Sequence, residues 1–291
     1  MSTMQKATIA AALLAAMFGS RAEAYVLLNT YNLGAGCLNA AAFNSATDQV
    51  WAKPCHGNFR TYDRNGVLQS TLTDTTVSDD SDFTFANEAV NINGTLVPAG
   101  SILYGNGDAP GGARLYGRDP TTGANLASIA APNPGFSFNG NMVGAGYSVT
   151  SNTFFLLSWT QDRVIEFDAA TGTVVSNFTT GGYDVFYGDV EVEDATGNLL
   201  LVSDANTNLR VMTAAGAFVQ DINLAALGIT GASGLGLDQF RGELWISSTN
   251  GRLYQLGGFQ PIPPTSAPAP GAIALIGLGL LGRGVLRRRA A

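Results

Sequence analysis

The chain has 291 residues, of which 36 are glycine and only 13% are charged, and it contains a single histidine. Its central part, residues 25–266, carries 9 basic and 21 acidic side chains, a net charge near −12. Nucleic acid is excluded as a partner of that part because phosphate binding requires Lys and Arg, and one histidine leaves almost no material for histidine metal sites or a Ser-His-Asp triad.

Residues 1–24 have the pattern of a secretory signal peptide. Lys6 precedes an apolar run of 12 residues, which is too short to span a bilayer. Ala22 and Ala24 form an A-x-A cleavage signature. We expect the Sec export machinery to recognise this segment and Tyr25 to become the new N-terminus. A buried N-terminal helix is the alternative.

Internal repetition is the strongest signal in residues 25–258. In the clearest stretch, 189–222, four short apolar or alternating segments are separated by turns rich in Gly, Asn and Thr. Four antiparallel strands joined by short turns make one blade of a β-propeller. The same order recurs, at least in part, over residues 37–72, 101–129, 144–178 and 234–256. Turns before the fourth strands contain Gly66, Gly123, Gly172 and Gly216, which supply the positive φ of a tight hairpin.

The two ends of this repeat complement each other. The last unit, 234–256, has only three segments, whereas the segment 26–33 belongs to no unit of its own. We expect 26–33 to add the outer strand to the last blade, which would remove an open sheet edge. The sequence therefore predicts an all-β propeller of about five four-stranded blades. Six blades are possible if residues 78–93 contain further strands.

Units four and five resemble NHL-type propeller repeats. The resemblance rests on residues 188–204, which read GDVEVEDATGNLLLVSD, and on the following 208–211, and it covers roughly 80 residues. It implies the propeller fold. It leaves the function open, because this fold hosts binding modules, lactonases and scaffolds alike.

The two cysteines, Cys37 and Cys55, are predicted to form a disulfide. They are equidistant from the predicted turn 44–48, so they should face each other across a hairpin. Export to an oxidising compartment also favours the bond. Two buried thiols are the alternative.

Carboxylates are the main candidates for chemistry. Asp189, Glu191 and Glu193 alternate along one predicted strand, so their side chains share a face. On an innermost strand, some would point toward the central channel and could bind Ca²⁺ through hard oxygens. Solvated charges on a strand face are the alternative.

Aromatic side chains could stack on sugars. Trp51, Trp159 and Trp245 all fall on second strands of their predicted blades. Second strands are packed between sheets, so a place in the core is the first expectation for all three.

The C-terminal end changes character. Residues 259–270 are rich in proline and read as an extended linker. The segment 271–291 begins with an apolar, Gly- and Leu-rich run, predicted to be a helix, and closes with Arg287, Arg288 and Arg289. An apolar run this short is marginal as a permanent membrane span, and its basic end should stay on the cytoplasmic side.

This end resembles the PEP-CTERM sorting domain of Gram-negative, exopolysaccharide-producing bacteria, over about 25 residues from 267 to 291. The resemblance implies cleavage by an exosortase-like enzyme and delivery to the envelope, cell surface or matrix. Pro268, Ala269 and Pro270 stand where the family has Pro-Glu-Pro, and Arg283 interrupts the apolar run. An ordinary single-pass anchor is the alternative.

Together these features predict an exported, envelope- or matrix-associated propeller that binds a glycan such as exopolysaccharide, or a protein, without catalysis. Ca²⁺ is a possible cofactor. A Ca²⁺-dependent, lactonase-like hydrolase and a purely structural surface protein are the alternatives.

Overall fold

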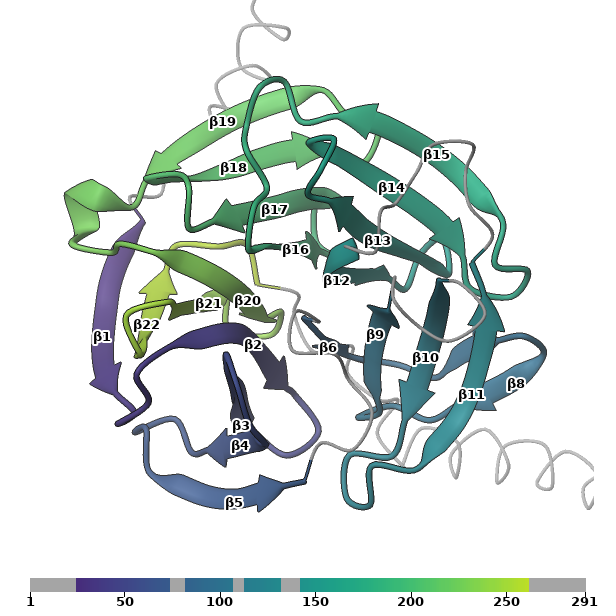
Figure 1. The fold of residues 1–291 in the computed structure, drawn as a ribbon, viewed down its shortest axis with the longest axis horizontal. Coiled ribbons are helices and arrows are strands. Elements are labelled where there is room, and N and C mark those ends of the chain that lie inside the picture. Colours follow the sequence, from purple (N-terminus) through teal and green to yellow (C-terminus); the bar gives the residue numbers. More distant parts are fainter. Residues whose placement is uncertain (1–24, 74–81, 107–112, 132–141, 262–291) are drawn as a thin grey trace, which may run out of the picture. The chain divides into compact units, whose positions relative to one another are not determined.

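The computed structural model describes residues 25–73, 82–106, 113–131 and 142–261. These residues form five four-stranded antiparallel sheets arranged around a central axis, with a two-stranded hairpin and one short 3-10 helix, Ala225–Leu227 (Figure 1). The predicted all-β propeller of five blades is confirmed.

The blades are numbered in their order along the chain. Within each blade, the strands are given from the innermost to the outermost. Blade 1 comprises β2 (Leu38–Asn44), β3 (Gln49–Pro54), β4 (Phe59–Tyr62) and β5 (Leu68–Leu72). Blade 2 comprises β6 (Thr84–Phe85), β9 (Ile102–Asn106), β10 (Arg114–Arg118) and β11 (Asn125–Ala130). Blade 3 comprises β12 (Met142–Ser148), β13 (Thr153–Ser158), β14 (Arg163–Asp168) and β15 (Val174–Thr179). Blade 4 comprises β16 (Gly188–Glu193), β17 (Asn198–Ser203), β18 (Asn208–Thr213) and β19 (Phe218–Asn223). Blade 5 comprises β20 (Ala232–Asp238), β21 (Glu243–Ser248), β22 (Arg252–Gly257) and β1 (Val26–Asn32).

The first strand of the propeller closes its last blade, as the sequence predicts. β1 pairs antiparallel with β22, from Val26 opposite Gly257 to Asn32 opposite Arg252. Tyr31 stacks on Trp245 with ring centroids 5.8 Å apart and donates its hydroxyl to the carbonyl of Arg64 in blade 1, at 2.8 Å. The closing strand therefore also contacts the neighbouring blade.

Arg64 joins blade 1 to blade 5. Its guanidinium donates to Asp238, at 2.8 Å, and to Glu243, and it lies 5.8 Å from the ring centroid of Trp245. The Asp238 side chain is fully buried. An ion pair at this position costs desolvation but fixes the geometry of the junction, because the buried carboxylate of Asp238 is shielded from water and is stabilised by its hydrogen bonds to Arg64 and Arg241.

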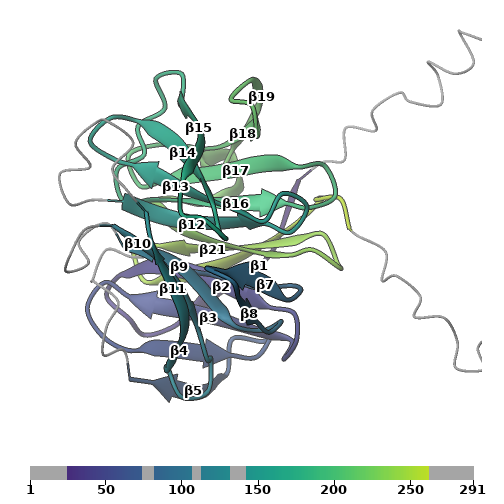
Figure 2. The ribbon, with the colours of Figure 1, turned by 90° about the vertical axis from the view of Figure 1, so that its right-hand side faces the viewer.

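The possibility of a sixth blade is wrong. Within the described part of residues 78–93, Thr84–Phe85 is the innermost strand of blade 2. The next strands, β7 (Val90–Ile92) and β8 (Thr95–Val97), pair only with each other. This hairpin is an insertion that packs beside β11 (Figure 2). No clear period is visible in this part of the sequence because the inner strand is only two residues long.

The predicted disulfide is confirmed. Cys37 and Cys55 are bonded, with their Cα atoms 5.5 Å apart, and the Cys55 amide donates to the Cys37 carbonyl at 3.3 Å. The bond joins the start of β2 to the end of β3, so it ties the innermost and second strands of blade 1 together.

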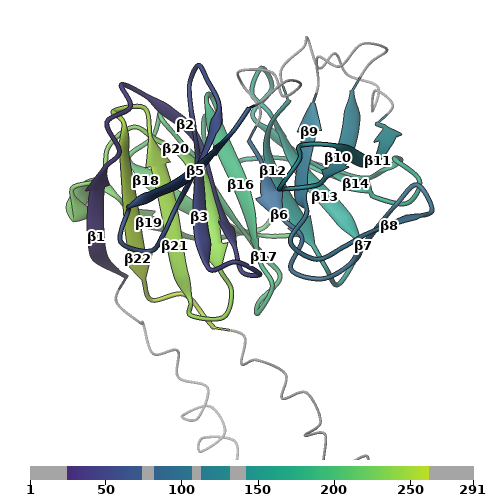
Figure 3. The ribbon, with the colours of Figure 1, turned by 90° about the horizontal axis from the view of Figure 1, so that it is seen from below.

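Both ends of the propeller lie on one face. β1 begins where β22 ends, and the rings of Tyr25 and Phe259 are 5.0 Å apart (Figure 3). We call this the end-bearing face; it also holds the turns 45–48, 194–197 and 239–242. The opposite face holds the loops 180–187, 204–207 and 224–231.

The predicted signal peptide with Ala22 and Ala24, and the predicted sorting tail with Pro268, Ala269, Pro270 and the arginine cluster Arg287–Arg289, fall outside the described residues. In the part of the chain that is described, no helix is long and apolar enough to cross a membrane.

Packing at the axis depends on small residues. β2 and β20 are buried at every position, and a Cβ on Gly236 would lie 2.5 Å from the backbone carbon of Ala42. Gly234 faces Ala40 and Ala41 in the same way. Five innermost strands can meet around one axis only where side chains do not separate them.

We therefore expect Gly236→Ala to lower the free energy of unfolding by about 3 kcal/mol, because the added methyl group would force two backbones apart. Gly36→Ala is the matched control, since no atom lies within 4 Å of its added Cβ. Urea unfolding followed by circular dichroism measures both. Equal stability of the two variants would contradict this account of the axis.

Candidate functional site

Asp189 lies on the innermost strand of blade 4 and is 1% exposed. Its carboxylate accepts three backbone hydrogen bonds. The amides of Ala145 and Val190 donate to Oδ1, at 3.1 and 2.7 Å, and the amide of Leu235 donates to Oδ2, at 2.7 Å. Ala145 is in β12 and Leu235 is in β20. One carboxylate therefore links the innermost strands of blades 3, 4 and 5.

Glu191 and Asp82 lie near Asp189 and are equally hidden, at 5% and 4% exposed. Burial, and then the charge of Asp189, raise the pKa of Glu191 well above its ordinary value. The same two causes, in the same order, raise the pKa of Asp82, while the buried Lys53 lowers it. Burial raises the pKa of Asp189 to about 8 against the opposing effect of its three backbone donors. The channel is thus lined by carboxyl groups that favour their protonated form.

Glu193 is at the other end of β16. Its Oε2 accepts from the hydroxyl of Thr196, at 2.5 Å, and its Oε1 accepts from the amide of Gln260, at 3.3 Å. Glu193 therefore fastens the chain that leaves blade 5. The alternative of solvated strand-face charges does not hold, since Asp189, Glu191 and Glu193 are all buried.

Among the described residues, no group of three or more His, Cys, Asp or Glu side chains is arranged to hold a metal ion. Asp189 and Glu191 are close neighbours, but both oxygens of Asp189 already accept hydrogen bonds, and those of Glu193 point to other partners. Calcium binding by this strand stays a prediction without a set of converging ligands.

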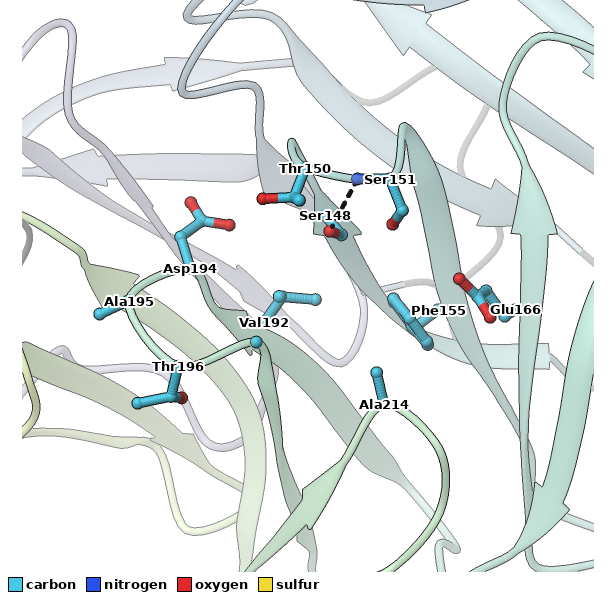
Figure 4. Close-up of a pocket in the computed structure, with 11 residues that line it drawn as sticks. Ser148, Thr150, Ser151, Phe155, Glu166, Val192, Asp194, Ala195, Thr196 and Ala214 are labelled. Carbon is cyan, nitrogen blue, oxygen red and sulfur yellow. Dashed lines mark hydrogen bonds between the residues drawn. The ribbon is translucent and has the colours of Figure 1, made fainter.

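A cleft opens between blades 3 and 4 on the end-bearing face (Figure 4). Its volume is about 430 Å³. The turn after β12 and the turn after β16 form two of its walls, and strands β13 and β14 contribute a third. The lining residues are Ser148, Thr150, Ser151, Phe155, Glu166, Val192, Asp194, Ala195, Thr196, Gly197 and Ala214.

Asp194 is the half-buried carboxylate of this cleft. Its backbone amide donates to Gln239 at 3.1 Å, and its Oδ2 accepts from Asn87 at 3.4 Å. Burial, together with the nearby charge of Glu88, raises the pKa of Asp194 to about 6, although the bond from Asn87 opposes the shift. Asp194 is therefore mostly ionised at neutral pH and becomes neutral in mild acid.

Three aromatic rings gather on the opposite face, and Trp159 is the one of them that the sequence had indicated as a candidate for stacking on sugars. Trp159 stacks on Phe186 with centroids 4.8 Å apart and an interplanar angle of 11°. Tyr187 packs edge-on against both, at 5.8 Å from Trp159 and 4.4 Å from Phe186. Phe186 is 40% exposed and Tyr187 is 38% exposed. We call these three residues the aromatic trio.

The trio shows how the tryptophans differ. Trp51 and Trp245 are buried in the core, as expected. Trp159 lies just after the end of β13, in a turn, and is only half-buried. The missed signal was local: Phe186 and Tyr187 are adjacent large aromatic residues in a loop that also contains glycines.

Hydrogen bonds fix the loop that carries the trio. The Ser203 hydroxyl donates to the Phe186 carbonyl at 2.7 Å, and the Val185 amide donates to Asp162 at 3.1 Å. Tyr187 has a φ of +44°, in the left-handed region that side chains other than glycine rarely adopt. Such strain persists only where the surroundings hold it, and it gathers at functional positions.

Comparison with known proteins adds no identity. No protein-family model matches this chain, and no curated protein matches it in sequence. Any inference about function therefore rests on the fold and on the geometry of the described residues.

The channel carboxyls predict an unusual pH dependence. Because folding raises the pKa of Asp82, Asp189 and Glu191, the folded state holds more protons than the unfolded chain between about pH 4 and pH 8. The contribution of these groups to the free energy of unfolding should therefore fall as pH rises through that window.

Glu191→Gln should weaken this fall, since the amide stays neutral and its oxygen still accepts from Thr84. The variant should match the wild type near pH 4 and be more stable near pH 8. Urea unfolding at several pH values measures both curves, with the exposed Glu88→Gln as control. Parallel curves for wild type and Glu191→Gln would contradict the assignment.

Proposed function

We propose that this protein is exported and held at the cell envelope, cell surface or extracellular matrix, where its propeller binds a glycan without catalysing a reaction. The aromatic trio is the observation that carries the binding function. Exposed aromatic rings offer flat apolar surfaces for the C–H faces of sugar rings, and the Tyr187 hydroxyl adds a hydrogen-bonding group.

The trio is suited to binding because its three rings are preorganised. Two rings are stacked, the third is braced against both, and the backbone beneath them is hydrogen-bonded to blade 4. A rigid platform loses little conformational entropy when a ligand settles on it, so a modest contact area can still give useful affinity.

The placement of the chain ends supports the same proposal. β1 begins and β22 ends on the face opposite the trio. If the C-terminal tail is processed by an exosortase-like enzyme or stays in the membrane, attachment would occur through the end-bearing face. The trio would then face outward, toward exopolysaccharide.

The absence of catalysis is part of the proposal, and it rests on the chemistry of the carboxylates. Asp189 uses its oxygens to join three blades, and Glu193 uses its own to fasten the end of blade 5. Groups committed to backbone hydrogen bonds are poorly placed to activate water.

Phe186→Ala should weaken retention of the protein by exopolysaccharide about tenfold, since loss of one stacking ring costs roughly 1–3 kcal/mol in comparable aromatic platforms. Sedimentation of the protein with purified exopolysaccharide of the producing organism measures this. Phe240→Ala is the matched control, because Phe240 is 44% exposed but follows β20 on the end-bearing face.

Equal loss in both variants, or no loss in either, would refute binding through the trio. Retention should also be indifferent to EDTA, since the trio needs no metal. Calcium-dependent retention would instead revive the channel carboxylates as a metal site.

A further inference from the structure

We propose that the cleft between blades 3 and 4 binds a sugar that carries a free ammonium group. This site is separate from the aromatic trio and does not rest on the function proposed for it. It lies on the other face of the propeller, and its lining combines hydroxyl groups and two carboxylates with a small apolar floor.

The cleft has two carboxylates and no basic side chain among its lining residues. Asp194 lies on one wall and Glu166 on another, with the cleft between them (Figure 4). Glu166 is held in place by the hydroxyls of Thr153 and Ser176, at 2.9 and 2.8 Å. Asp194 accepts the long bond from Asn87 and a backbone hydrogen bond from Val149, and neither of these partners is a cation. A cationic ligand is therefore the natural complement of Asp194.

The remaining lining fits a sugar better than a bare metal ion or an alkyl amine. Ser148, Thr150, Ser151 and Thr196 bring hydroxyl groups to the rim, which can exchange hydrogen bonds with ring hydroxyls. Phe155 and Val192 supply an apolar floor (Figure 4). A volume of about 430 Å³ lies in the range of small-molecule sites, whereas a metal ion needs several oxygens converging on one point.

Charge supports the same ligand class. The net charge of residues 25–266 is near −12, so cations are attracted to the propeller as a whole. The charge of Glu88 raises the pKa of Asp194, and the charge of Asp194 contributes to the raised pKa of Tyr147 and of Glu191, so the titratable groups that interact with Asp194 are acidic. None of these groups is a cation, so none of them competes with a cationic ligand for the carboxylate of Asp194.

Titration calorimetry of the full chain in mild detergent tests the site with a tetramer of glucosamine as the probe. We expect binding at pH 7 and at least tenfold weaker binding by Asp194→Asn. The N-acetylated tetramer, which lacks the ammonium, should bind at least tenfold more weakly to the wild type. Binding should also weaken as pH falls below 6, where Asp194 takes up a proton.

Asp184→Asn is the matched control, because it removes one exposed carboxylate from the opposite face. An equal loss in that variant would mean nonspecific attraction of a polycation and would overturn the proposal. Binding of the N-acetylated tetramer as tight as that of glucosamine, or unchanged binding by a folded Asp194→Asn, would overturn it as well.

A tetralysine peptide distinguishes the source of the ammonium. If the peptide binds in an Asp194-dependent way and the glucosamine tetramer does not, the ligand is a protein and the proposal fails.

Thr150→Val provides a second variant should Asp194→Asn not fold. Loss of this one exposed rim hydroxyl should weaken glucosamine binding severalfold and leave the melting temperature unchanged. Unchanged binding would count against the site. Phe186→Ala should bind the glucosamine tetramer normally, so failure of the trio and failure of the cleft are separable.

Discussion

The close approach of the innermost strands at the axis is the constraint on which the rest of the molecule depends. Where β20 meets β2, Gly234 and Gly236 bring the backbones into contact. Where blades 3, 4 and 5 meet, one buried carboxylate, that of Asp189, accepts amide hydrogens from all three. Unpaired amides in a buried channel would each cost free energy, and Asp189 satisfies them without adding bulk. Small residues and one shared acceptor therefore let five blades close a ring.

Closing that ring also decides which surfaces are available for binding. Because β1 completes blade 5, both ends of the propeller emerge on one face, and the loops of the opposite face are free of the termini. Arg64 of blade 1 and Tyr31 of blade 5 fasten the same junction. The interactions that hold blades 1 and 5 together are thus the ones that give the molecule an attached side and a presented side, if its tail acts as the sequence predicts.

Much of the fold could be predicted because it repeats. Apolar segments of even length, glycine turns and an incomplete last unit were enough to infer five blades, the closing role of β1 and the disulfide between Cys37 and Cys55. The innermost strand of blade 2 was missed since Thr84–Phe85 is too short to show a period and a hairpin follows it. The role of Asp189 could not be predicted, because its partners are backbone amides, and every residue except proline has one.

The two proposed binding surfaces were harder to predict than the blades for a related reason. A blade is local in sequence, whereas each candidate surface combines two blades: Trp159 belongs to blade 3 and packs on rings that precede β16, and Asp194 faces residues of β12 to β14 across the cleft. The alternating acidic residues of β16 suggested a metal site. In the structure they are buried, and Asp189 and Glu193 form hydrogen bonds that hold the blades and the end of the propeller in place. In a propeller this narrow, a side chain that points to the axis serves mainly to hold the blades together. The turns and loops at the two faces are then the places for ligand chemistry, because their side chains are not needed to close the ring.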